Sequence, residues 1–63
     1  MNPYTPITIQ FPDQPEMADV ETTWAAFVAD NDDDTITDVR KQIEANNYAV
    51  IGGGASPLVW VFA

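Results

Sequence analysis

Hydrophobic and polar residues alternate near the start of the chain. In the segment TPITIQF, the apolar side chains of Ile7, Ile9 and Phe11 are separated by polar ones. A period of two is typical of a strand that is buried on one side. Because proline cannot donate a hydrogen bond to a neighbouring strand, the prolines that bracket the run favour a position at the edge of a sheet.

The pattern changes to a helical repeat from Asp19 onward. The apolar residues of this segment fall at i, i+4, i+7 and i+8 and are Val20, Trp24, Phe27 and Val28. This spacing places them on one stripe of an α-helix. Asp19 is the predicted N-cap of the helix, and Glu21 lies in its first turn, where the helix dipole favours an acidic side chain. The opposite side is rich in alanine, and we expect it to contact the second helix or a partner, or to remain exposed.

A second helix is predicted to begin near Thr35. Thr35 and Asp38 have the spacing of a capping box, in which two side chains satisfy the free amides of a helix start. The apolar stripe of this helix is formed by Ile36, Val39 and Ile43. Its predicted end is Asn46–Asn47, because asparagine tolerates the left-handed conformation that terminates helices.

The pattern of the C-terminal part of the chain predicts a β-hairpin. Two β-rich runs, YAVI and LVWVF, are joined by three glycines and a Ser-Pro pair. The last run, residues 58–62, is apolar at every position, which favours a central strand. The sequence therefore predicts one α+β domain over residues 1–63, of order β-α-α-β-β, with two helices on one face of a three-stranded antiparallel sheet whose last strand lies in the middle.

In this arrangement the sheet has a second face that the helices do not cover. It would display members of one of two alternate sets of residues, either Val59, Val61 and Ala63 or Leu58, Trp60 and Phe62. A monomer seldom leaves so much apolar area bare. We therefore expect a homodimer, another protein or the N-terminal segment to cover this face.

The charge of the chain restricts its partners. Ten acidic residues and only two basic ones give a net charge of −8, and every charged side chain lies between Asp13 and Glu44. A surface this negative does not approach nucleic acid or anionic lipid unaided, so a basic protein is the expected partner. The hydrophobic content of 46% argues for a folded chain.

The composition also restricts chemistry and location. The chain has no cysteine and no histidine, which excludes disulfides, common zinc sites and imidazole catalysis. No apolar run is long enough to cross a bilayer, and the N-terminus does not resemble a signal peptide. We expect a complete small cytoplasmic protein that uses no cofactor.

The segment DNDDDTITD, residues 30–38, is the candidate metal loop. Counted from its start as a calcium-binding EF-hand loop, Asp32, Asp34 and Asp38 occupy liganding positions. The glycine of the sharp turn is missing, and Lys41 stands where a bidentate glutamate completes the calcium shell. The sequence thus predicts weak calcium binding as a third function and no dedicated metal site.

Catalytic patterns are incomplete. Ser56 has no histidine to activate it. The three glycines at 52–54 lack the Gly-Lys-Ser/Thr ending and the helix of a phosphate-binding loop. We do not expect an enzyme.

The acidic residues are therefore the main candidate binding site. Lys41 lies three residues from both Asp38 and Glu44, and Arg40 lies four residues from Glu44, so local ion pairs are expected to occupy both cations. The other carboxylates stay unneutralised and can occupy a surface built for phosphates. The alternative is that they only keep a small apolar domain soluble.

Short length, strong acidity, absence of cysteine and a neutral apolar sheet together resemble phage-encoded anti-defence proteins, in particular anti-CRISPR proteins that imitate DNA. The resemblance covers the size, charge and layout of the whole chain and includes no signature motif. It implies a stoichiometric inhibitor that occupies a basic nucleic-acid-binding protein, such as a CRISPR effector subunit, in the host cytoplasm. The residues that carry the implied contact are Glu21, Asp30, Asp32, Asp33, Asp34, Asp38 and Glu44.

A structural or assembly protein is the second hypothesis. In it the apolar strands Tyr48 to Ile51 and Leu58 to Phe62 make a homomeric or virion contact, and the charge only confers solubility. The candidate contact residues are Val59, Trp60, Val61 and Phe62.

Overall fold

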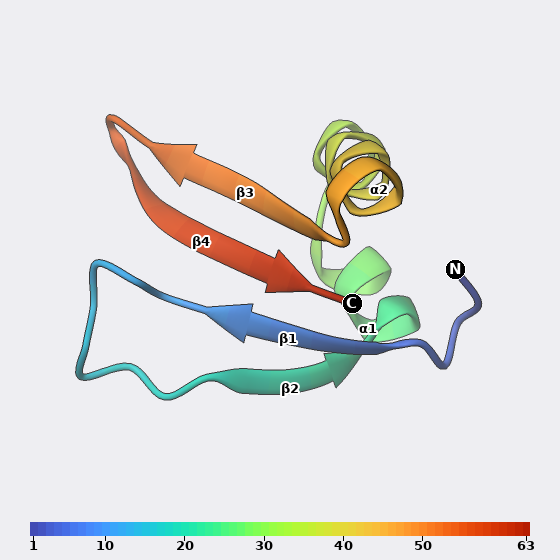
Figure 1. Cartoon of the computed structure of the whole chain (residues 1–63), viewed down its shortest axis with the longest axis horizontal. Coiled ribbons are helices and arrows are strands. Elements are labelled where there is room, and N and C mark those ends of the chain that lie inside the picture. The colour runs from blue at the N-terminus through green and yellow to red at the C-terminus, as the bar shows by residue number, and fades with distance from the viewer.

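The computed structural model describes residues 1–63 and has two helices packed on a four-stranded antiparallel sheet. The predicted α+β class is confirmed. The elements in chain order are β1 (Pro6–Gln10), β2 (Val20–Thr23), α1 (Trp24–Asp30), α2 (Asp33–Asn46), β3 (Tyr48–Gly53) and β4 (Ser56–Phe62) (Figure 1).

The sheet contains one strand more than the sequence predicted. Its order is β2-β1-β4-β3, so the C-terminal strand β4 lies between β1 and β3. The expected edge position of β1 is wrong, because β2 pairs with its outer side. The prolines remain compatible with this position, since Pro6 is the first residue of the strand and Pro12 lies beyond its end.

The segment Val20–Thr23 forms β2 instead of the first helical turn. Three of its four residues are β-branched, a composition that favours a strand, and Val20 pairs with Ile9 of β1. Helix α1 begins only at Trp24. Its N-cap is Thr23, whose hydroxyl accepts a hydrogen bond from the Ala26 amide at 3.3 Å, so the predicted cap at Asp19 is wrong.

Helix α2 begins two residues before the predicted start. Asp32 is its N-cap, and its carboxylate accepts a hydrogen bond from the Thr35 amide at 2.8 Å. The capping box of Thr35 and Asp38 does not form, because both residues lie inside the helix, after its N-cap. The predicted end is confirmed: Asn47 adopts the left-handed conformation, with φ of 68°.

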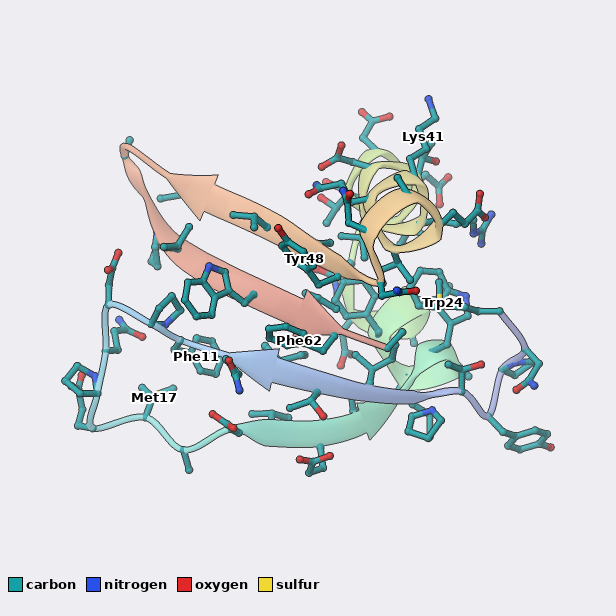
Figure 2. All side chains as sticks on the ribbon, in the orientation of Figure 1. Phe11, Met17, Trp24, Lys41, Tyr48 and Phe62 are labelled. Carbon is teal, nitrogen blue, oxygen red and sulfur yellow. The ribbon has the colours of Figure 1, made fainter.

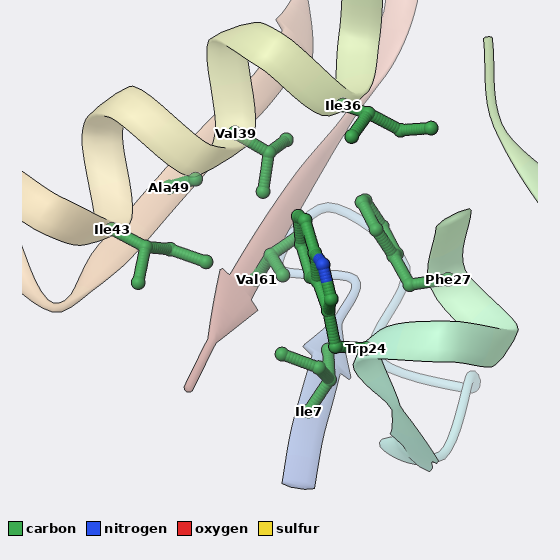
Figure 3. Close-up of a cluster of buried hydrophobic side chains, with 8 residues drawn as sticks. All are labelled: Ile7, Trp24, Phe27, Ile36, Val39, Ile43, Ala49 and Val61. Carbon is green, nitrogen blue, oxygen red and sulfur yellow. The ribbon is translucent and has the colours of Figure 1, made fainter. Parts of the chain in front are cut away.

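The core lies between the helices and one face of the sheet. Its eight buried side chains are Ile7, Trp24, Phe27, Ile36, Val39, Ile43, Ala49 and Val61 (Figure 3). The rings of Trp24 and Phe27 stack at a centroid distance of 5.5 Å. The predicted stripes of the two helices therefore supply most of the core, except for Val20 and Val28, which are exposed.

The helices cover only part of the sheet. Both gather at the end where β1 starts and β4 finishes, and the β1–β2 connection and the β3–β4 turn extend away from them (Figure 1). Ile9, Ile51 and Val59 pack against the core but are only partly buried. The small core and the uncovered part of the sheet leave this chain with much of its apolar surface in contact with solvent.

Candidate protein-binding surfaces

The acidic side chains all lie on the surface. Each of the ten is exposed, and each is surrounded by water rather than by the core. Four of them gather where the two helices meet: Asp30 ends α1, Asp32 caps α2, and Asp33 and Asp34 form its first turn. The first-turn carboxylates face the positive end of the helix dipole, which stabilises their charges. We refer to these four residues as the helix-junction acids.

The pKa of the Asp32 carboxyl is held below its ordinary value of 3.8 by hydrogen bonds from the Thr35 amide and hydroxyl. A folded-state pKa below the unfolded one stabilises the fold at pH values above the unfolded pKa. This contribution is lost as the pH falls through the folded value. The cap is therefore fully effective at neutral pH.

We predict that replacing Asp32 with Asn removes this pH dependence and leaves the cap in place. An asparagine side chain accepts the same amide hydrogen bond but does not titrate there. The difference in melting temperature between wild type and Asp32→Asn should be constant from about pH 7 to pH 5. Below about pH 4 the melting temperature of the wild type should fall further than that of the variant. Thermal melts followed by circular dichroism across this range test it, and parallel curves would contradict it.

The remaining predicted contact residues do not join the helix junction in one cluster. Asp38 lies on α2 and accepts a hydrogen bond from Gln42 at 2.9 Å. Glu44 is further along the same helix. Glu21 belongs to β2 and not to a helix, and its carboxylate accepts a hydrogen bond from the Thr8 hydroxyl at 3.1 Å. The acids thus surround the helices and also reach the sheet.

The two cations do not pair as the sequence predicted. Arg40 lies with its guanidinium carbon 5.5 Å from the centre of the Trp24 ring, on the outside of the core. None of the side-chain hydrogen bonds involves Arg40 or Lys41. The guanidinium of Arg40 thus lies over an aromatic ring, a position that favours a cation, and a surface ion pair would gain little.

The sheet face that is turned away from the helices carries an aromatic cluster. Strand register decides its membership: Val61 is fully buried in the core and Val59 packs against it, so the alternate residues Trp60 and Phe62 point outward. Tyr48 pairs with Phe62 across β3 and β4, and their rings stack at 6.0 Å (Figure 2). We call this the open face.

One further apolar side chain, Val50, lies at the border of the open face. Val50 is the partner of Trp60 in β3, and both remain more than a third exposed, at 38% and 36%. The assembly hypothesis placed Tyr48 and Val50 in an apolar contact strand, but it did not predict that they share a face with Trp60 and Phe62. The signal was present in the hairpin, because a tight turn sets the register and therefore which residues share a face.

The outer edge of β3 is occupied by a side chain of α2. The Gln42 amide donates to the Val50 carbonyl at 3.1 Å and accepts from the Val50 amide at 2.9 Å. These are the two backbone groups through which another strand would pair. Gln42 therefore covers the middle of this edge and leaves the open face as the larger accessible surface of the sheet.

One open pocket of about 380 Å³ lies beside α1. Its lining residues are Met1, Pro3, Trp24, Ala25, Val28 and Arg40. It contains no carboxylate, thiol or hydroxyl. No group of three or more acidic residues is arranged to hold a metal ion, so the calcium hypothesis gains no support from the geometry. None of the helices has the length and apolar character needed to cross a membrane.

Comparison with known proteins found no matching family model, no similar curated protein and no similar solved structure.

Proposed function

We propose that the protein is a stoichiometric inhibitor that binds a basic, nucleic-acid-binding surface of another protein in the cytoplasm. The observation that supports it is the exposure of all ten acidic side chains on a chain of net charge −8, with four of them gathered at the helix junction. An array of carboxylates at the end of a rigid helix presents negative charge to lysine and arginine side chains, as a phosphate backbone does.

In the proposed mechanism the acidic side chains and the open face contribute to different steps of binding. The carboxylates raise the rate of encounter with a positive partner and replace the phosphates that its cations normally hold. The apolar open face then slows dissociation, because buried apolar area and aromatic anchors contribute most of the affinity of protein complexes. Neither step requires a cofactor or a bond-making reaction. A CRISPR effector subunit is one partner with the required charge.

The helix-junction acids are tested by removing charge while Asp32 is kept as the helix cap. The Asp33→Asn/Asp34→Asn variant should bind the partner about tenfold more weakly than wild type, since two exposed ion pairs contribute about 0.2–1 kcal/mol each. The Asp13→Asn/Glu16→Gln variant loses the same charge from the β1–β2 connection and serves as the matched control. The measurement is retention of lysate proteins by each purified bait at low and at high salt.

Recovery of a basic nucleic-acid-binding protein at low salt by wild type and control, with loss for the junction variant, would support the proposal. Equal retention by all three baits would overturn it. If the wild-type bait captured only copies of itself, an assembly function through the open face would replace the inhibitor. That self-association should be abolished by Trp60→Glu in a variant that circular dichroism shows to be folded.

A further inference from the structure

The open face contains an ordered row of side chains that crosses all four strands. Glu21 of β2 is the register partner of Thr8 in β1, Thr8 is the partner of Phe62 in β4, and Phe62 is the partner of Tyr48 in β3. Directly opposed residues point to the same side of a sheet. The row therefore runs from a carboxylate through a hydroxyl to two stacked aromatic rings.

A second row repeats this order two residues further along the strands. Gln10 is the partner of Trp60, and Trp60 is the partner of Val50. On the other side of Gln10, its amide donates a hydrogen bond to the Asp19 carboxylate at 3.2 Å, just before β2 begins. This row also runs from a carboxylate through a polar side chain to an aromatic ring, and it ends at the apolar side chain of Val50.

The polar residues of β1 hold the carboxylates in place. The Thr8 hydroxyl donates to Glu21 at 3.1 Å and the Gln10 amide donates to Asp19 at 3.2 Å. Each carboxylate has two oxygens with room for several hydrogen bonds, so both can still accept from a partner. The open face thus combines two oriented anions with the exposed ring of Trp60 and the partly buried ring of Phe62, one strand further on.

We propose that the open face binds an extended, arginine-bearing segment of another protein. Arginine has a planar cation that stacks on aromatic rings and pairs with carboxylates through two parallel hydrogen bonds. The two rows are separated by two residues along the strands, about 6.7 Å, which is also the distance between alternate side chains of an extended chain. Arginines at alternate positions therefore meet successive rows.

Charge complementarity selects this partner over a second copy of the chain. The open face has two carboxylates and no cation, because Arg40 and Lys41 both belong to α2. In a two-fold dimer through this face, each copy would meet only the groups that it carries itself. Glu21 and Asp19 would lose water without gaining a positive partner, which is unfavourable. An arginine-bearing segment satisfies them.

The position of Gln42 directs the partner away from the outer edge of β3. Its amide occupies the backbone groups of Val50, so a strand added beside β3 would have to displace two hydrogen bonds. A segment that lies on the open face and runs along β1 and β4 displaces no backbone hydrogen bond. The proposed site does not include the helix-junction acids. The proposal also does not require that the partner binds nucleic acid.

The test is a titration of the ¹⁵N-labelled protein with an acetylated, amidated peptide of alternating arginine and threonine. Amide and indole shifts should concentrate on the open face, at Thr8, Glu21, Trp60 and Phe62 and at their neighbours. The same peptide with lysine in place of arginine should bind at least threefold more weakly. A preference for arginine distinguishes stacking from a general attraction of positive charge to an acidic protein.

Two variants with the same change of charge complete the design. Asp19→Asn/Glu21→Gln should weaken binding of the arginine peptide at least fivefold, and Asp13→Asn/Glu16→Gln should change it less than twofold. Trp60→Leu keeps an apolar side chain and should lower the preference for arginine over lysine.

Shifts centred on the helix junction, equal losses in the two charge variants, or equal affinity for both peptides would each overturn the proposal. Open-face shifts that appear on raising the protein concentration without peptide would also overturn it, in favour of a second copy of this chain. Because Asp33 and Asp34 are unchanged in these variants, failure here leaves the inhibitor proposal to be judged by its own experiment.

Discussion

Replacing Gly52 with alanine should lower the stability of the fold by about 2 kcal/mol or more. Gly52 has φ of +79° and lies at the register shift between Ile51 and Gly53. A side chain in this backbone region costs about 1–2 kcal/mol. The added Cβ would also overlap the carbonyl oxygen of Pro57, which belongs to the backbone and cannot turn aside. The hairpin of β3 and β4 must therefore distort.

Gly54 provides a matched control within the same turn. It also has a positive φ, of +60°, but no atom lies within 4 Å of the position of an added Cβ. Gly54→Ala should therefore cost only the backbone strain, about 1–2 kcal/mol. Thermal melts of both variants measure the difference, with an expected fall of roughly 10 °C or more for Gly52→Ala. Equal melting temperatures for the two variants would show that the contact with Pro57 does not constrain the turn.

Replacing Trp24 with alanine should have the largest effect on folding. Trp24 is 5% exposed, stacks on Phe27 and supports the Arg40 guanidinium. Truncating a buried tryptophan costs about 3–5 kcal/mol. A chain of 63 residues has a total stability of roughly 3–9 kcal/mol, so most of it would be lost. We expect a variant that is largely unfolded at 37 °C.

Urea titration followed by far-ultraviolet circular dichroism measures this loss. Tyr4→Ala is the control, because Tyr4 is an aromatic residue that is 85% exposed. A surface substitution of this kind should change stability by less than about 0.5 kcal/mol. A Trp24→Ala variant with the midpoint of the control would mean that the eight buried side chains are not one cooperative core.

The misassigned segment Val20–Thr23 shows where periodicity fails. Val20 lies four residues before Trp24, so it extended the helical stripe by coincidence. The β-branched composition of the segment pointed to a strand, but a single strand is not stable without a partner. The partner is β1, whose Ile9 pairs with Val20 from eleven positions earlier in the chain. No local pattern contains that contact.

The same non-local pairing built the open face. Glu21 and Asp19 were assigned to a helix start, and only the strand register places them beside Thr8 and Gln10. In contrast, the helix-junction acids were identified correctly as neighbours, because Asp30 to Asp34 are adjacent in the chain whatever fold it adopts. The local part of the candidate site was predictable, and the part assembled from four strands was not.

The sequence by itself determined the α+β class, the apolar stripe of α2, the end of that helix at Asn47, the hairpin and the strong negative charge. All of these depend on residues close together in the chain, through periodicity, backbone preference and composition. Only the tertiary structure decided that β2 exists, that Val59 and Val61 face the helices, and that two acids stand in line with Trp60 and Phe62. These features depend on the pairing of distant strands, where a shift of one residue turns every side chain to the opposite face.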